Sequence, residues 1–263
     1  MYFPMILAFY YHSFGGMEFL ASIIITHLAS IVFLYLGGET NRSHLGVKEM
    51  FMLTTGVWIL ASLFAALPFV FIEHISYSDA FFETMSGITT TGSTVLSGLD
   101  TMHPSILLWR SILQWLGGVG FIVMGVAILP FLNVGGMRLF QTESSDWSDK
   151  SASKTRRVAL DILLVYISLT VCCFIGYRFA GMENFDAVNH AMTTISTGGY
   201  STSDSSMGHF SKLAHWNAIV FMFLGGLPFL LLIRSMQQKS FGPLWRDAQI
   251  QGFAKLVMCC SLS

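Results

Sequence analysis

Long apolar runs separated by polar segments organise this chain. A helix needs about 20 apolar residues to cross a bilayer core of ~30 Å, and four charge-free runs have that length. A fifth run qualifies if Asp161 lies at its cytosolic end, where it can pair with Arg157 one helical turn earlier. The pattern therefore predicts an all-α polytopic membrane protein. The predicted crossings are Phe19 to Gly38, Phe51 to Ile72, Ser111 to Gly136, roughly Val158 to Tyr177, and Leu213 to Ile233.

Shorter apolar segments lie at both ends of the chain. Met1 to His12 cannot span fully and lacks the basic start and cleavage site of a secretory signal, so we interpret it as a shortened first helix. Ala248 to Ser263 begins a new apolar segment after Asp247 and stops partway. We expect from both ends that the chain is a truncated form of a longer product.

Composition supports the membrane setting. Hydrophobic residues make up 53% of the chain and charged residues only 11%, which leaves too little polar surface for a soluble globule of this size. The formal charge of -1 argues against nucleic acid, which needs a basic face. The cysteines form two adjacent pairs, Cys172-Cys173 and Cys259-Cys260, which we interpret as packing residues because sequence neighbours do not easily bridge each other.

Lysine and arginine positions predict the orientation, because basic residues are retained in short cytosolic loops. Three basic segments are predicted inside, and two acidic segments without Lys or Arg are predicted outside. The inside segments are Gly38 to Met50, Gly136 to Arg157 and Arg234 to Arg246, and the outside segments are Glu73 to His103 and Gly181 to Ser211.

The two outside segments carry the same motif twice, which makes the chain a repeat. A constant offset of 107 superimposes Asp79 on Asp186 and Gly92 on Gly199, together with an alanine, a methionine and an isoleucine between them. Two crossings separate the copies, so the repeats are parallel rather than inverted. Each unit is predicted as helix, short re-entrant helix plus loop, helix. The predicted divisions are an amino-terminal helix pair over 1–47, a first pore unit over 48–136 with its loop at 78–95, a second over 155–236 with its loop at 185–202, and the start of a third over 245–263.

The motif has the chemistry of a cation site. Ser78-Asp79 can start a short inward-running helix whose carboxyl end near Ile88 directs a partial negative charge into the membrane. From Thr89 to Gly92 we expect extended backbone, whose carbonyl oxygens replace lost hydration water. Glycine supplies backbone angles that other residues avoid, and threonine hydroxyls can brace the strand or coordinate the ion. The predicted ligands are Thr89, Thr90, Thr91 and Gly92 in the first loop and Ser196, Thr197, Gly198 and Gly199 in the second.

The helix that follows each loop also repeats. Leu116-Gly117-Gly118 matches Leu224-Gly225-Gly226, with the glycines offset by 108, and Trp109 matches Trp216. The glycine pair fits a close helix contact, and here it also predicts an inner helix that approaches the filter.

Polar and aromatic residues around the loops admit several interpretations. Arg110 can tune ion entry, extend to the outer interface or pair with a pore-loop acid. Glu83 can attract cations or form a structural hydrogen bond, and His190 at the matching position is predicted to be neutral and hydrogen-bonded. Trp109, Trp115 and Trp216 are interpreted as interfacial anchors or packing residues.

These residues together resemble the TrkH/KtrB members of the Trk/Ktr/HKT potassium transporters, across essentially the whole chain. The most specific matches are Asp79 to Glu83 leading to Thr89 to Gly92, the run Gln114 to Gly118 ending at Ile128-Leu129-Pro130, and Ser196 to Thr202. Leu224 to Phe229 and Trp245-Arg246-Asp247 resemble the proteobacterial TrkH branch.

The resemblance implies a potassium-uptake subunit of the bacterial inner membrane, with no enzymatic activity and no organic cofactor. It implies four channel-like units whose glycines meet at the filter, and Gly92 and Gly199 match two of them. Glycine at both positions favours potassium over sodium. It also implies a cytosolic TrkA-type nucleotide-binding partner, a homodimer of the full-length protein and contact with membrane lipid. Two of the four expected units are present, so half of the filter is missing; either the chain is a truncated product, which we favour, or two copies pair to rebuild the ring.

Two other classes of function stay open. An intramembrane hydrolase needs a nucleophile and base on facing helices, and neither a Gly-x-Ser-x-Gly nor a His-Glu-x-x-His motif occurs. A non-conducting membrane subunit that assembles with or regulates a full-length transporter is the closer alternative.

Overall fold

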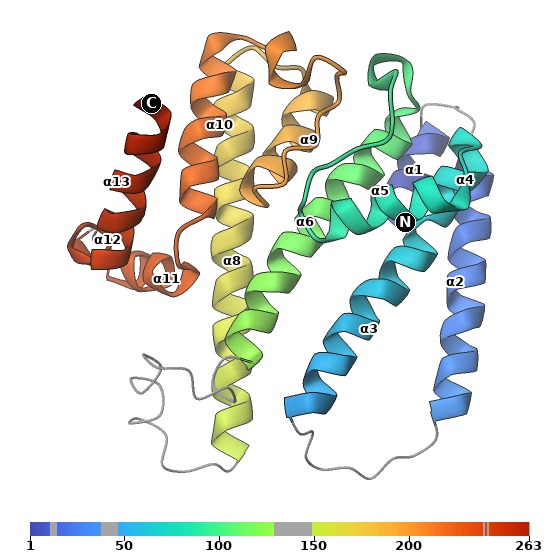
Figure 1. Cartoon of the computed structure of the whole chain (residues 1–263), viewed down its shortest axis with the longest axis horizontal. Coiled ribbons are helices and arrows are strands. Elements are labelled where there is room, and N and C mark those ends of the chain that lie inside the picture. The colour runs from blue at the N-terminus through green and yellow to red at the C-terminus, as the bar shows by residue number, and fades with distance from the viewer. Residues whose placement is uncertain (11–14, 38–46, 129–148, 239, 241, 263) are drawn as a thin grey trace.

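The computed structural model of the chain describes residues 1–10, 15–37, 47–128, 149–238, 240 and 242–262, and this part of the chain is helical, without strands (Figure 1). Four helical segments are long and apolar enough to cross a membrane, and a bent pair adds a fifth. The all-α fold predicted from the apolar runs is confirmed. The longer helices are α2 (Gly16–Gly37), α3 (Val47–Ala65), α6 (Pro104–Ile128), α8 (Asp149–Phe179) and α10 (Lys212–Gly225). Helix α13 (Ala248–Leu262) is similar in length to α10, and the shorter helices are α1 (Tyr2–Tyr10), α4 (Leu67–Glu73), α5 (Tyr77–Ile88), α9 (Asn184–Ile195), α11 (Phe229–Gln237) and α12 (Gly242–Arg246), with 3-10 turns at Leu99–Thr101 and Ser206–His209.

The candidate spans agree with the predicted crossings in four cases. They are Gly16–Gly37, Phe51–Glu73, Pro104–Met124 and Arg157–Phe179. The third begins several residues before the predicted Ser111, because Pro104 opens a helix whose first turns are already buried. Residues 38–46 of the predicted basic segment Gly38 to Met50, residues 136–148 of the segment Gly136 to Arg157, and the end of the run Ile128-Leu129-Pro130 lie outside the described residues.

The fifth crossing, predicted as one helix from Leu213 to Ile233, is wrong in shape. It consists of α10 and α11, which are bent by 95° relative to each other across a short break. The Gly226 amide donates to Met222 and Phe223 and closes α10, and Pro228, which lacks an amide hydrogen, precedes α11. Hydropathy does not detect this break, because every residue in it is apolar or small.

Helices α5 and α9 both lie in the upper half of the molecule, with their connecting loops at the top in Figure 1. Helix α6 packs against both of them, so it belongs to the surroundings of each repeat. Two clusters of buried apolar residues hold these contacts: one joins α2, α4, α5 and α6 around Phe19 and Phe69, and the other joins α8, α9 and α10 around Tyr166 and Ile195.

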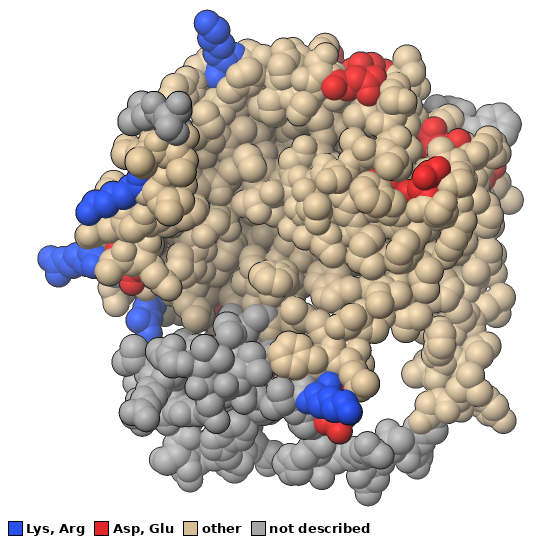
Figure 2. All heavy atoms as spheres, in the orientation of Figure 1, with Lys and Arg blue, Asp and Glu red and all other residues tan. Residues whose placement is uncertain are grey.

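The outer faces of the long helices are apolar and exposed, as expected for lipid contact. On α2, Leu34 is 77% exposed and Tyr35 87%, and only 17% of the span is buried inside the protein. In Figure 2, acidic side chains gather at the upper right, and most of the visible lysine and arginine side chains lie at the left edge and at the bottom.

Three smaller predictions can be checked in the described residues. Asp161 accepts a hydrogen bond from Gln237 of α11 at 3.4 Å, so its described partner is not the predicted Arg157. The predicted short amino-terminal helix is α1, and the segment after Asp247 is α13. All four cysteines are free thiols, and Cys173 is buried, whereas Cys172, Cys259 and Cys260 are exposed, so the interpretation as packing residues holds inside the protein for Cys173.

Candidate cation site

Each copy of the motif begins with a 12-residue helix, α5 or α9. Helix α5 starts slightly earlier than the predicted Ser78-Asp79, because the Ser76 hydroxyl accepts a hydrogen bond from the Asp79 amide at 3.1 Å and caps it. Both helices carry an aspartate in the first turn and no basic residue in the last turn. They end at equivalent residues, Ile88 and Ile195, where the helix dipole places partial negative charge.

The segments after the helices share an unusual backbone. Thr90 and Thr197 have φ angles of 58° and 56°, and Gly92 and Gly199 have φ angles of 80° and 78°. A left-handed conformation is rare for a β-branched residue and costs about 1–3 kcal/mol. The same strain at positions 107 residues apart shows that the sequence repeat is also a repeat of backbone conformation. The prediction of extended backbone from Thr89 to Gly92 is wrong at its first two residues, because Thr89 has helical angles and Thr90 is left-handed, so that a tight turn intervenes.

Amide hydrogen bonds hold this turn identically in both copies. Thr91 donates to Ser86 at 3.0 Å, and Gly198 donates to Thr193 at 3.0 Å. The glycine amides make the next bonds to the same acceptors, at 3.5 Å for Gly92 and 3.3 Å for Gly199. The backbone amides of each segment therefore point back toward the end of the preceding short helix, and the carbonyl oxygens of the segment are left available to other partners.

The carbonyl oxygens of the predicted ligands have no hydrogen-bond donor among the residues that the structure describes. This holds for Thr90, Thr91, Gly92, Thr197, Gly198 and Gly199. Three of the threonine hydroxyls form local hydrogen bonds: Thr89 donates to the Met85 carbonyl at 2.7 Å, the Thr91 hydroxyl lies 2.8 Å from that of Thr89, and Thr197 donates to the Ser196 carbonyl at 2.7 Å. Unpaired main-chain oxygens at the end of a helix dipole are the kind of group that coordinates a desolvated cation.

The two segments lie against each other. A β-carbon built on Gly92 would lie 1.9 Å from the Gly198 carbonyl oxygen, so only glycine fits there. Gln114 of α6 is fully buried between them: its Oε1 accepts from the Tyr200 amide at 3.1 Å, and a β-carbon on Gly198 would lie 2.4 Å from its amide carbon. The structure thus brings the eight predicted residues into two adjoining strips.

The inner-helix glycines make the predicted close approach. A β-carbon on Gly117 would lie 1.9 Å from the Ile88 carbonyl oxygen, and one on Gly225 would lie 2.6 Å from the Ile195 carbonyl oxygen. In both repeats, therefore, the last carbonyl of the short helix contacts the first glycine of the pair. This contact places each inner helix beside the start of a ligand segment, Thr89 to Gly92 in the first repeat and Ser196 to Gly199 in the second.

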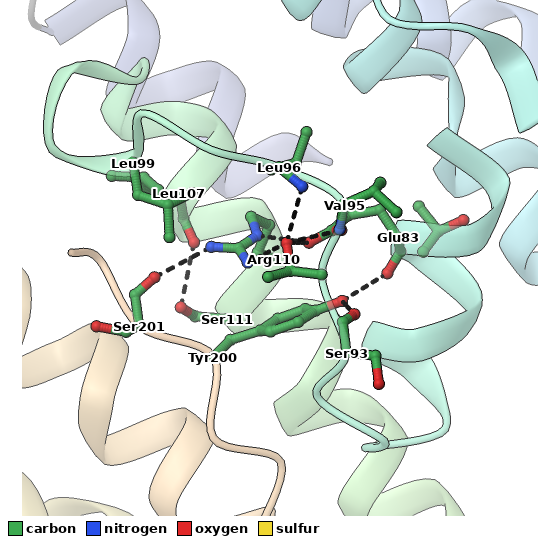
Figure 3. A network of polar contacts seen from close by, with 12 residues as sticks. Glu83, Ser93, Val95, Leu96, Leu99, Leu107, Arg110, Ser111, Tyr200 and Ser201 are labelled. Carbon is green, nitrogen blue, oxygen red and sulfur yellow. Dashed lines mark hydrogen bonds and ion pairs between the residues drawn. The ribbon is translucent and has the colours of Figure 1, made fainter. Parts of the chain in front are cut away.

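A buried ion pair lies behind the first segment. Arg110 Nε is 2.8 Å from Glu83 Oε1, and the two side chains are 1% and 0% exposed (Figure 3). The interpretation of Arg110 as extending to the interface is wrong, and its pairing with a pore-loop acid is confirmed. Glu83 also accepts hydrogen bonds from the Thr94 hydroxyl and the Val95 amide, so it is a structural acceptor behind the loop.

The second repeat has a histidine where the first has the acidic partner of the ion pair. His190, which matches Glu83, lies 3.3 Å from the Ser201 hydroxyl and 3.4 Å from the Thr202 hydroxyl. Burial lowers the pKa of His190 to about 4, and the Asp186 carboxylate only partly opposes this shift. The imidazole is therefore neutral at neutral pH, as predicted from the sequence.

The tryptophans divide between the two predicted roles. Trp109 is buried and donates to the Ala65 carbonyl at 3.0 Å, and Trp115 donates to the Thr170 hydroxyl at 3.0 Å, so both are packing residues. Trp216 is 65% exposed, which fits an interfacial anchor.

Sequence reasoning missed two residues that hold the segments, Gln114 and Tyr200. Tyr200 donates its hydroxyl to the Glu83 carbonyl at 2.8 Å, across the boundary between the repeats. A polar glutamine within a predicted membrane crossing, one helical turn after Arg110, is the signal that could have indicated Gln114.

Comparison with known proteins gives consistent results. Residues 15–259 match the family model of TrkH, described as a cation transport protein. The chain is 46% identical over 218 residues to the Trk system potassium uptake protein TrkI of Halomonas elongata, an alignment that covers 82% of this chain and 44% of the relative. It is 36% identical to TrkH of Escherichia coli K12, covering 100% of this chain and 56% of the relative.

The fold has a solved counterpart. The crystal structure of the potassium transporter TrkH from Vibrio parahaemolyticus superposes with a TM-score of 0.82 at 31% identity, covering 95% of this chain and 52% of that chain. The chain spans about half the length of the relatives it matches.

Proposed function

The chain belongs to the TrkH family of cation transport proteins, and on that premise we propose that it carries two units of a potassium-uptake pore. It is a multi-pass protein of the bacterial inner membrane. In the proposal, K⁺ binds to backbone and hydroxyl oxygens of Thr89 to Gly92 and Ser196 to Gly199 as it crosses. The division into pore units over 48–136 and 155–236 is part of the same proposal.

The observation that carries this proposal is the identical strained backbone of the two ligand segments. Strain at Thr90 and Thr197 costs free energy and is retained in both copies, together with the same amide bonds and the same free carbonyls. Strained backbone that recurs in this way indicates a functional constraint rather than a packing accident. A dehydrated cation between such carbonyls supplies that constraint.

The surroundings of Gly92 and Gly199 support a ring of pore units around the path of the ion. A β-carbon on Gly92 would meet the carbonyl of Gly198 in the next segment, whereas one on Gly199 would meet nothing within 4 Å. Because the segments are equivalent by repeat, the open side of Gly199 is where a third segment would lie. We therefore propose that further pore units complete the ring.

Partners follow from the family resemblance and extend the proposal. A cytosolic TrkA-type nucleotide-binding protein would regulate the transporter, and the full-length protein would form a homodimer in the lipid bilayer. The printed names of the relatives describe potassium uptake by those proteins, and this activity supports K⁺ as the transported ion.

Growth rescue tests the proposal. The protein, expressed from its natural gene, should restore growth of potassium-uptake-deficient bacteria at low potassium, and Gly92→Ser should weaken rescue or admit sodium, because a side chain at Gly92 displaces the Gly198 carbonyl. Gly208→Ser is the matched control, since its β-carbon would meet nothing within 4 Å. Unchanged rescue and selectivity in Gly92→Ser would remove this residue from the filter. Absence of uptake together with co-purification of a full-length transporter would favour a non-conducting subunit.

A further inference from the structure

We propose that Arg110 is a positioning residue that locks the two filter segments to each other and thereby sets the discrimination between K⁺ and Na⁺. This inference rests on the proposed function of the segments. Its structural basis is a single network that starts at the buried Arg110 on α6, includes the buried Glu83 and Tyr200, and reaches residues of both segments (Figure 3).

Because Glu83 and Arg110 are buried, neither charge is stable in the fold without the other. Both side chains are essentially inaccessible, and a buried charge is tolerated only when its partner and its remaining hydrogen bonds are in place. The Glu83 carboxylate accepts hydrogen bonds from the Arg110 guanidinium, the Thr94 hydroxyl and the Val95 amide. The segment after Gly92 is thereby tied to α5 and α6 at a defined position.

The same guanidinium crosses to the second repeat. Its Nη1 donates to the Ser201 carbonyl at 3.0 Å, and its Nη2 donates to the Thr94 hydroxyl at 3.2 Å. Its central carbon lies 4.2 Å from the centre of the Tyr200 ring, within cation–π distance. One planar, five-donor group therefore contacts both segments at once, which a lysine ammonium with its flexible stem cannot reproduce.

The attachment points are adjacent to the filter glycines. Tyr200 directly follows Gly199, and its hydroxyl donates to the Glu83 carbonyl at 2.8 Å and to the Ser93 carbonyl at 3.3 Å. Ser93 directly follows Gly92. The network thus sets the separation of the two glycine-bearing strips immediately behind their carbonyls. Ion selectivity depends on how many carbonyl dipoles the ion meets and at what spacing, so a change in this separation alters selectivity.

The second repeat does not duplicate the ion pair. The positions that match Glu83 and Arg110 by the offset of 107 are His190 and Asn217. Asn217 donates to the Cys173 carbonyl on α8 at 3.0 Å, within its own repeat. Arg110 therefore provides a connection between repeats, in contrast to the glycine contacts, which recur in each unit.

The test compares cation fluxes of the protein expressed from its natural gene, in membrane vesicles, with the variant Arg110→Lys. Lysine keeps the positive charge opposite Glu83 but loses the two hydrogen bonds that the guanidinium donates to the Ser201 carbonyl and the Thr94 hydroxyl. We expect the ratio of K⁺ to Na⁺ uptake to fall about tenfold, the scale of one charge-assisted hydrogen bond. A loss of folded protein lowers both fluxes equally and leaves their ratio unchanged, so the ratio separates positioning from folding.

Two further variants complete the design. Arg178→Lys is the matched control, because Arg178 also donates to a carbonyl, that of Met182, and lies outside the network; its flux ratio should equal that of wild type. Tyr200→Phe removes only the two hydroxyl contacts and should lower the ratio in the same direction by a smaller factor, which keeps a readout if Arg110→Lys does not accumulate. A wild-type flux ratio in both Arg110→Lys and Tyr200→Phe would overturn the inference.

Failure of the proposed function is distinguishable from failure of this inference. If the wild-type protein moves no K⁺, the proposed function is wrong, and the network is then decided by a double-mutant cycle of Arg110→Lys and Tyr200→Phe on the melting temperature in detergent. Coupled residues give non-additive shifts. Additive shifts would show that no connection between the repeats exists.

Discussion

Gly117→Ala tests the contact between the inner helix and the end of the first short helix. The new β-carbon would lie 1.9 Å from the Ile88 carbonyl oxygen and 2.7 Å from its carbon. An alanine has no rotamer to change and the obstacle is backbone, so the helices must separate by about 1.5 Å to restore an ordinary contact of 3.4 Å. Overpacking of this kind costs about 1–3 kcal/mol, against a gain of about 1 kcal/mol from helix propensity.

Gly120→Ala on the same helix is the matched control. Its β-carbon would lie 3.6 Å from the nearest atom of the Trp58 ring, an ordinary contact, so the propensity gain of about 0.5–1 kcal/mol should remain. Because the propensity gain is common to both variants, Gly117→Ala should be less stable than Gly120→Ala by the overpacking cost alone, roughly 1–3 kcal/mol, measured by thermal unfolding of the purified protein in detergent.

Potassium uptake should also fall in Gly117→Ala, because Ile88 immediately precedes the ligand segment. Equal melting temperatures and equal uptake for the two alanine variants would refute the close approach. Gly225→Ala offers an internal repeat of the experiment with a milder clash of 2.6 Å.

Two other predictions concern the second repeat and the strained turns. Burial holds the folded-state pKa of His190 at about 4, below its ordinary value of 6.5, so the unfolded chain takes up the proton first as pH falls. Stability should be highest above about pH 6.5 and should decline toward pH 4 by roughly 2–3 kcal/mol, and denaturant unfolding across this range should show a flatter profile for His190→Gln. Thr90→Asn should stabilise the fold by about 1 kcal/mol, because asparagine tolerates the left-handed region. Thr197→Asn should gain less in the same melting assay, because it also removes the hydrogen bond from the Thr197 hydroxyl to the Ser196 carbonyl, and destabilisation by both substitutions would contradict the strain assigned to these turns.

Local sequence was sufficient for the helices and for the repeat. A membrane span is an additive property of about 20 residues, so hydropathy located α2, α3, α6 and α8 without knowledge of their neighbours. The end of α5 at Ile88 and the close approach of Gly117 were also predictable, since the motif occurs twice and each copy supports the interpretation of the other.

Features that depend on distant residues escaped the sequence. The 95° bend between α10 and α11 lies in an apolar run that hydropathy reads as one helix. The choice among three roles for Arg110 required knowing that Glu83 is 2.8 Å away and that neither side chain reaches solvent. Gln114 gained a role only when α6 was found to lie between two segments that are remote in sequence.

The sequence by itself determined that this is a polytopic membrane protein with a duplicated polar motif, because span length and internal repetition are encoded in consecutive residues. Only the tertiary structure decided how the two copies meet. The contact of Gly92 with Gly198 and the hydrogen bond of Arg110 to Ser201 join segments that lie about 90 to 106 residues apart, and pairwise contacts of that kind are not additive along the chain.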